Sequence, residues 1–463
     1  MLLIAAMVFA DERDDDVFGA PSEPPPGDTT PPPAESPPPS VPATGDFGDV
    51  QLGTTSDADI AASLAEADDR LTLGGKLYLR ADAAIVDEAE LADTTLSSPN
   101  LLDLFADVRP NDRVRGYASG RFRYDFTVAS GDTDLWGNVL EPGSVTLDQL
   151  WLKFDLGRVA YVTTGRQRIK WGSGRFWNPT DFLNAQALDA LSATVFDERT
   201  GVTLLKVHVP IEKIGANLYA VGSFDGADNF EQVGGALRTE WVFWTAELAL
   251  SAAAREGDPL RLGADLSAGL GPIDVHVESA VRHGDDSPYY EGTFNLEKFK
   301  LPEEVSREED WIPQVVAGAE LGIKYSDRDS LYIGAEYFYN DAGYADSELL
   351  PYLLFEGAYT PFYLGQHYAA AYVYLPAPSR WDDGSVTVST LANLSDRTYV
   401  SRVDVSHRAL TYLQLSAYAA YHYGVNGEFH FSYEVEPIPG VLDDGLTIPA
   451  PVAEFGVGAM VNF

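Results

Sequence analysis

The chain has 463 residues, a formal net charge of −40 and no cysteine. Without cysteine, disulfide frameworks, thiol catalysis and cysteine-ligated metals are excluded, and the strong negative charge makes nucleic acid a poor partner. Beyond the N-terminus no window of 18 apolar residues occurs, which excludes a transmembrane helix.

The first 70 residues differ in composition from the rest of the chain. Residues 1–10 are apolar, with Val8 and Ala10 at the small-residue positions of a signal-peptide cleavage site, but the basic start is missing. Residues 11–70 carry 15 acids and two arginines, and 21–42 is rich in proline. Such a segment buries too little apolar surface to fold. We therefore expect a truncated signal-peptide-like segment at 1–10, or simply an apolar end, and a disordered tail at 11–70.

From residue 71 onward, apolar and polar residues alternate in segments separated by turn residues. In 113–128 the odd positions are mostly charged and the even positions are apolar or small. A period of two predicts a β-strand with one apolar and one polar face. The boundary near Glu240 has no turn residue, so 16 strands remain an alternative to 18. The 18 predicted strands lie near 71–85, 99–109, 113–127, 144–155, 158–171, 199–209, 214–224, 231–240, 242–254, 259–270, 272–283, 313–326, 330–340, 363–376, 384–394, 397–406, 410–422 and 452–463.

The connections between these segments differ in length in a regular way. Those after strands 1, 3, 5, 11, 13 and 17 are long, and those after strands 2, 4, 6, 10, 12 and 16 are short. Long loops at one end and short turns at the other are the arrangement of antiparallel up-and-down barrels that span a membrane.

The chain ends on an alternating segment whose apolar positions share one parity with a terminal aromatic residue. This segment resembles the closing strand of bacterial outer-membrane β-barrels. The resemblance implies that the barrel-assembly machinery of a Gram-negative cell reads it as an insertion signal, carried by Phe455, Val457, Val461 and Phe463. A soluble sandwich that happens to end in Phe is the alternative. We expect an all-β transmembrane barrel over 71–463 in the outer membrane, with the tail in the periplasm.

Charged residues concentrate on the predicted polar faces. Rows of opposite charge on the wall of a pore orient polar solutes and set ion preference. The alternative is that neighbours, such as Arg123 with Asp125 or Lys153 with Asp155, neutralise one another and only stiffen the wall. The predicted pore-lining residues are Arg113, Arg115, Arg121, Arg123, Lys153, Arg166, Arg168, Lys170, Asp274, Glu278, Glu320, Glu336 and Asp404.

Residues 165–181 form the most distinctive motif. Gly172 and Gly174 permit a sharp bend, and Asn178 or Thr180 can cap a helix over 181–192. The motif resembles several largely uncharacterised porin-like outer-membrane families, and the resemblance extends to 393–396 and to the two final strands. In general porins a loop after an early strand folds into the lumen and narrows it. The loop 172–198 is expected either to do so or to pack on the rim. The constriction residues would be Arg175, Trp177, Asp181 and Asp189.

Other chemistry is sparse. The loop 284–312 holds nine acids, which would share divalent cations with lipopolysaccharide phosphates or form a solvated acidic rim. His283 beside Asp285 is the only local hint of a hydrolase, and no two histidines have the spacing of metal ligands. We predict no cofactor, no metal and no reaction.

The sequence therefore favours a porin-like channel for passive diffusion of small hydrophilic solutes. A dedicated conduit for an anionic polymer, resembling alginate-export barrels, is the second interpretation. A structural or surface-interaction barrel with a closed lumen is the third. A TonB-dependent transporter is disfavoured, because about 70 residues before the first strand are too few for its plug domain. The oligomeric state is left open.

Overall fold

The structure, a computed structural model, describes residues 70–88, 94–133, 139–184, 200–285, 287–296, 298–326, 329–437 and 445–463. All of these belong to one compact unit. The predicted signal-like segment 1–10 and almost all of the predicted tail lie outside the described residues. Among the described helices, none has the length and apolar character needed to cross a membrane.

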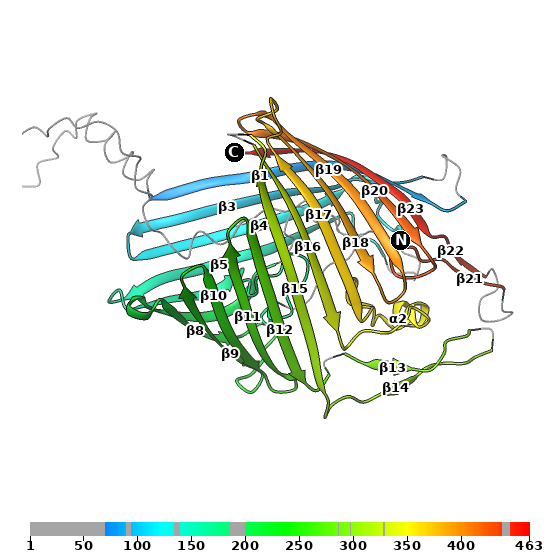
Figure 1. The fold of residues 1–463 in the computed structure, drawn as a ribbon, viewed down its shortest axis with the longest axis horizontal. Coiled ribbons are helices and arrows are strands. Elements are labelled where there is room, and N and C mark those ends of the chain that lie inside the picture. Colours follow the sequence, from blue (N-terminus) through cyan, green and yellow to red (C-terminus); the bar gives the residue numbers. More distant parts are fainter. Residues whose placement is uncertain are drawn as a thin grey trace, which may run out of the picture. The chain divides into compact units, whose positions relative to one another are not determined.

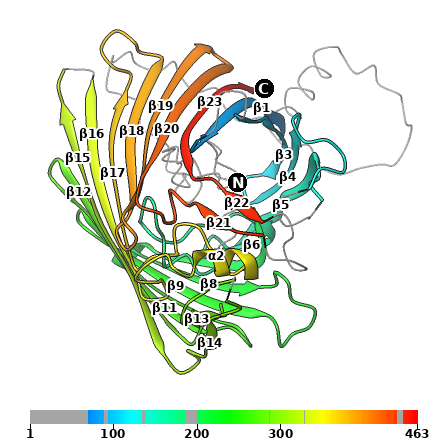
Figure 2. The same ribbon diagram turned by 90° about the vertical axis from the view of Figure 1, so that its right-hand side faces the viewer.

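Long antiparallel strands form one closed sheet (Figures 1 and 2). Each strand pairs with the next, and the last strand pairs with the first. Over the described residues there are 18 of them, so the predicted up-and-down barrel is confirmed, with every strand close to its predicted place. They are β1 (Leu71–Val86), β3 (Pro99–Asn111), β4 (Val114–Asp125), β5 (Gly143–Leu156), β6 (Ala160–Gln167), β7 (Val202–Ile211), β8 (Ala216–Ser223), β9 (Gly234–Phe243), β10 (Ala246–Ala254), β11 (Leu260–Leu270), β12 (Ile273–His283), β15 (Trp311–Lys324), β16 (Ser330–Asn340), β17 (His367–Pro376), β18 (Gly384–Asn393), β19 (Thr398–Leu410), β20 (Leu413–Gly424) and β23 (Pro451–Asn462).

The alternative of 16 strands is resolved at the weak boundary near Glu240. β9 continues three residues past it, and β9 joins β10 through the two-residue turn 244–245. Trp244 adopts a positive φ of 56°, a conformation that glycine or asparagine usually supplies in such turns. The sequence therefore carried no recognisable turn signal at this hairpin.

The outer face of the barrel is apolar and exposed. On β5, for example, Val145, Leu147, Leu150 and Leu152 are 72%, 51%, 54% and 44% exposed. Exposed aromatic residues lie near the strand ends, among them Tyr124, Trp311 and Tyr325. An apolar band flanked by aromatic residues is the surface that a lipid bilayer requires of a spanning barrel.

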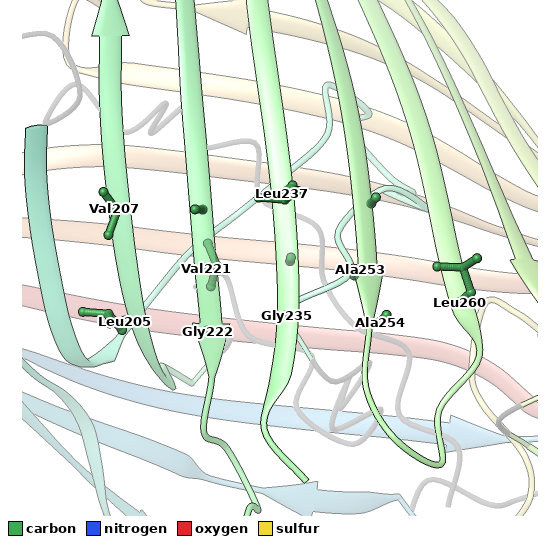
Figure 3. A pocket seen from close by; sticks show the side chains of 12 residues that line it. Leu205, Val207, Val221, Gly222, Gly235, Leu237, Ala253, Ala254 and Leu260 are labelled. Carbon is green, nitrogen blue, oxygen red and sulfur yellow. The ribbon is translucent and has the colours of Figure 1, made fainter. Parts of the chain in front are cut away.

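A hollow of about 510 Å³ lies in the wall between β7 and β11 (Figure 3). Gly222 and Gly235 lie opposite each other there, and a Cβ added at Gly235 would meet nothing within 4 Å. Exposed Leu205, Leu237 and Leu260 border the hollow. All its lining residues are glycine or aliphatic, so the hollow belongs to the apolar outer surface rather than to a polar site.

At the long-loop end, three loops pack together into what we call the loop cap, defined as the described residues of 284–310, 341–366 and 425–450. The short elements of the cap gather at the right-hand end of Figure 1. The cap has its own apolar core, to which Tyr290, Leu350 and Phe431 contribute one residue from each loop. Its elements are β13 (Tyr289–Glu291), β14 (Glu303–Val305), α2 (Leu350–Glu356), β21 (Tyr433–Val435) and β22 (Leu446–Ile448).

The terminal strand closes the barrel between β1 and β20. Phe463 exchanges two backbone hydrogen bonds with Gly75 of β1, with N···O distances of 2.8 and 3.0 Å. Phe455 and Val457 are exposed on the outer face of β23, and Val461 lies opposite Leu77. The role of these residues as an insertion signal stays a prediction.

The inner side of this seam is filled by a buried polar cluster. Arg80 pairs with Asp82 at 2.6 Å, and the Tyr418 hydroxyl donates to Asp82 at 3.0 Å. The Arg402 guanidinium carbon lies 3.6 Å from the centre of the Tyr418 ring. Gly456 gives this ring its space, because a Cβ there would stand 2.1 Å from Tyr418 and 2.2 Å from Asp82.

We predict that Gly456→Val destabilises the closed barrel by about 1–3 kcal/mol, the usual cost of overpacking. The measurement is the midpoint of urea unfolding. Unfolding is monitored by the loss of the fast-migrating band that the unheated protein gives in electrophoresis. Gly120→Val is the matched control, because a Cβ at Gly120 meets nothing within 4 Å. Equal midpoints for the two variants would contradict the packing argument.

Candidate functional site

The chain leaves β6 at Gln167 and turns inward. We call the described residues 168–184 the inward loop. Its first part packs on the inner face of the neighbouring wall, where Ile169 and Trp171 join Leu204 and Val221 in a buried cluster. The loop then reaches β12 and β16, which lie six and eight places further round the ring of strands.

Glu278 of β12 is the first point that holds the inward loop. One carboxylate oxygen accepts the backbone N–H groups of Ser173, at 2.5 Å, and of Gly174. The other accepts the hydroxyl of Thr180 at 2.9 Å and its backbone N–H at 3.4 Å. The residue has no exposed surface, so its carboxylate replaces water as the partner of the loop backbone.

Glu336 of β16 is the second point. Its Oε1 accepts the backbone N–H groups of Phe176 and Trp177, at 2.9 and 3.0 Å. Its Oε2 accepts the N–H of Arg175 at 2.7 Å and lies 2.8 Å from the Nε2 of His276. Four donors thus converge on one carboxylate, which is a strong, charge-assisted arrangement.

Two glycines allow this path, as the sequence predicted for the bend. Gly172 has φ of 94°, in the region that favours glycine. A Cβ at Gly174 would stand 2.0 Å from the carbonyl oxygen of Trp177. The close turn around Glu278 therefore needs residues without side chains.

The tip of the inward loop carries two contrasting side chains. The Arg175 guanidinium lies over the Tyr372 ring at 4.3 Å and pairs with Glu320 at 2.5 Å, remaining partly exposed. Trp177 is 1% exposed, stacks against Phe338 at 5.4 Å and donates its indole N–H to the carbonyl of Phe362 at 3.1 Å. Arg175 therefore presents charge at the tip, and Trp177 anchors it.

The predicted basic residues are largely placed beside acids. Arg115 pairs with Asp107 at 3.0 Å, and Arg121 pairs with Asp103 at 2.8 Å. Arg113 lies in the turn between β3 and β4, where it binds Asp155. Neutralised pairs are thus common on this wall, although with other partners than the sequence suggested. Arg123 and Lys153 are half-buried on the inner face, and Lys170 is exposed.

A β-bulge changes the faces in the first half of β5. Ser119 pairs with Gln149 and Gly120 with Leu147, so Asp148 is an extra residue that turns inward. There it binds Arg168 at 2.7 Å and accepts the N–H of Gly201 at 3.2 Å. The inward position of Asp148 cannot be predicted from the alternation of apolar and polar residues along the sequence.

Arg166 differs from its predicted place. Its register partner is Leu150, which is 54% exposed on the outer face, and its own guanidinium pairs with Asp225 at 3.3 Å. The prediction gave Arg166, Arg168 and Lys170 one shared parity. That parity fails because the regular strand β6 ends at Gln167.

The predicted acidic residues all lie on the inner face, in different surroundings. Glu278 and Glu336 are buried by the inward loop, and Glu320 binds Arg175. Asp404 pairs with Arg402 at 2.6 Å. Asp274 lies directly opposite Glu320 in the β12–β15 register and is exposed.

Of the remaining candidate residues, some are bound to neighbouring side chains and others lie outside the described residues. Asp181 accepts a hydrogen bond from Asn184 at 2.7 Å, and Asp189 and most of the predicted helix 181–192 lie outside the described residues. His283 packs edge-on against Trp311, whereas Asp285 pairs with Arg282. Within the described ranges, no group of three or more His, Asp or Glu side chains is arranged to hold a metal ion.

The sequence matches no family model and no curated protein. Solved structures resemble its fold. OccAB4 of Acinetobacter baumannii has a TM-score of 0.50 and 8% identity, with 85% of this chain and 98% of that chain covered. OpdK, an outer membrane protein of Pseudomonas aeruginosa, has a TM-score of 0.49 and 11% identity, with 85% and 98% covered. A triple mutant of the Rhodopseudomonas blastica porin has a TM-score of 0.39 and 10% identity, with 85% and 100% covered. At such identity, the likeness to OccAB4 supports the barrel fold alone.

We predict that Glu336→Gln loosens the tip of the inward loop. The amide removes the charge and turns an N–H₂ group towards N–H donors, which costs about 1.5–3 kcal/mol per charge-assisted hydrogen bond. Backbone amides of 175–177 should then exchange with solvent about 10- to 100-fold faster. Hydrogen-exchange mass spectrometry measures this, with Glu320→Gln as the control, because Glu320 binds the Arg175 side chain and the Tyr372 hydroxyl instead. Equal exchange in both variants would refute the anchoring role.

Proposed function

We propose that the protein is a porin-like channel of the bacterial outer membrane, through which small hydrophilic solutes diffuse passively. One observation carries the proposal. In a closed barrel with an apolar outer face, the inward loop leaves one part of the wall and is held by Glu278 and Glu336 on another. A loop held in this way narrows the lumen and excludes large solutes.

The membrane location follows from the surface of the barrel. Exposed leucine and valine on the outer strand faces would be costly in water, where a large apolar patch promotes association. Lipid removes that cost, and a closed barrel leaves no unpaired strand edge in the hydrocarbon. The terminal strand and the acidic loops would be recognised by the assembly machinery and by lipopolysaccharide with its cations, respectively.

The charge pattern of the wall favours small solutes over an anionic polymer. A conduit for a polyanion needs a continuous row of available cations, whereas Arg115, Arg121 and Arg168 each bind a neighbouring acid. Arg175 is similar, since its guanidinium forms an ion pair with Glu320. We therefore propose only mild charge selection, and no catalytic step.

Conductance tests the channel directly. Purified protein in a planar bilayer should give stable, ohmic single-channel currents, and the double variant Glu278→Gln with Glu336→Gln should conduct more than the wild type, because the inward loop is released. Hydrogen exchange and the unheated electrophoretic band establish that both proteins are folded. A folded wild-type barrel without current would instead favour the structural barrel with a closed lumen.

We predict that Asp274 influences ion preference more than Arg121 does. Asp274 is exposed on the inner face, whereas Arg121 is 3% exposed and neutralised by Asp103. Asp274→Lys should shift the reversal potential in a salt gradient towards anions. Arg121→Gln should change it little while lowering stability. A larger shift for Arg121→Gln would mean that the ion path runs along β4 instead.

A further inference from the structure

The inward loop and the loop cap meet at one side chain. Trp177, at the tip of the inward loop, packs in a cluster with Phe362 and Phe429, which belong to two different cap loops. The wall completes this cluster with Phe338 and Tyr368, whose rings lie 5.4 and 5.7 Å from that of Trp177. The inward loop is therefore in packed contact with the cap as well as with the wall.

The backbone of Phe362 carries the polar part of the contact. Its carbonyl accepts the indole N–H of Trp177 at 3.1 Å, and its own N–H donates to Glu428 at 2.7 Å. Phe362 also has φ of 64°, an outlier for a bulky residue. A residue held in an unfavourable conformation is kept there by its surroundings, here by a hydrogen bond on each side.

Glu428 is buried at the junction of the cap with the wall. Tyr368 and Asn393 donate to one of its oxygens, at 2.6 and 2.8 Å, and Tyr359 donates to the other at 3.3 Å. Its own backbone N–H donates to Asp396 at 2.7 Å. Two carboxyl groups thus share one enclosed network that spans two cap loops and the turn between β18 and β19.

We propose that Phe362 links the protonation state of Glu428 to Trp177, so that the loop cap controls how far the inward loop narrows the channel. The inference rests on the proposed channel function. It makes Trp177 a positioning residue, because it acts on the lumen through the loop that carries it.

Glu428 is suited to report pH because of what surrounds it. Burial and the nearby Asp396 carboxylate together raise the pKa of Glu428 to about 7, against the hydrogen bonds that favour the charged form. The other groups that face it are the hydroxyls of Tyr359 and Tyr368. Nearby, His422 of β20 donates its Nδ1–H to the carbonyl of Phe429, and its Nε2 lies 3.6 Å from Glu454.

The sign of the effect follows from this raised pKa. Between the ordinary pKa of a glutamic acid and about 7, the folded state binds a proton that the unfolded state has lost. The stability of the cap is therefore greatest below that window and falls as the pH rises through it. Above it, a second negative charge stands beside Asp396, the network loosens, and Phe362 holds Trp177 less firmly.

Single-channel conductance between pH 5 and pH 9 tests the link. In the wild type, conductance should rise through neutral pH. Glu428→Gln should abolish the rise and keep the low-pH value throughout. Glu434→Gln is the matched control, because Glu434 is exposed in β21 of the same loop, and it should behave as the wild type. Trp177→Phe, which keeps a ring but loses the indole donor, should also abolish the rise.

A second measurement, cysteine labelling, reports the structure of the cap and does not depend on channel conductance. Val435 is 4% exposed in β21, and Val425 is 55% exposed in the same loop. Cysteine placed singly at each position, in a chain with no native cysteine, gives a labelling ratio that cancels the pH dependence of the reagent. The ratio for Val435→Cys over Val425→Cys should rise through neutral pH, and should stay constant when Glu428→Gln is added. In the Trp177→Phe background the ratio should still rise.

The outcomes separate the two proposals. A labelling ratio that does not change with pH, or an unchanged conductance rise in Glu428→Gln or Trp177→Phe, overturns the link. A pH-dependent ratio with no current in any folded variant overturns the channel function and supports Glu428 as the control of the cap alone. The expected pattern in both readouts supports the whole proposal.

Discussion

The fixed position of the inward loop depends on wall carboxylates that accept backbone N–H groups. Irregular backbone inside a barrel leaves donors without strand partners, and each must find an acceptor. Glu278 and Glu336 supply them, with three backbone donors on each carboxylate. A hydrogen bond to a charged group contributes about 1.5–3 kcal/mol, so a few such bonds outweigh the entropy of ordering a short segment. The apolar contacts of Trp171 and Trp177 on either side are available only because the backbone between them is held there.

The outer and inner faces of the barrel wall differ in polarity. On its outer face, alternate residues are apolar and exposed, and on its inner face the intervening residues form ion pairs such as Arg121 with Asp103. Removing one member of such a buried pair lowers the free energy of unfolding by more than the intact pair contributes to it, because the remaining charge loses its partner. The pairs therefore constrain which inner residues can change, and they leave the unpaired, exposed positions such as Asp274 to influence passing ions.

The strands were predictable because a period of two, repeated 18 times, is a signal that local chemistry carries by itself. Their faces were predictable too, and Glu278 and Glu336 were correctly placed on the inner one. Their partners were not, since a carboxylate in a strand does not reveal that a loop nearly half the barrel away in strand order will bind it. Asp148 was missed and Arg166 was misplaced for a related reason. A bulge and an early strand end shift the parity, and neither has a sequence signature here. The segment 393–396 was singled out by resemblance only. Its structural reason is that Asn393 and Asp396 are buried in the network around Glu428.

The same chemistry recurs at both ends of the contact between the inward loop and the cap, with one difference. Glu336 lies 2.8 Å from the Nε2 of His276 and belongs to a strand that the whole sheet holds in place. Glu428 belongs to a loop and shares its enclosure with a second carboxylate, Asp396, without a cation among the groups that bind it. Charge on Glu428 is opposed by this neighbour. Ionisation of the cap carboxylate Glu428 therefore changes the balance of the cap. Phe362 is hydrogen-bonded to both Glu428 and Trp177. A change in the ionisation of Glu428 therefore affects the position of Trp177 at the tip of the inward loop, and not the cap alone.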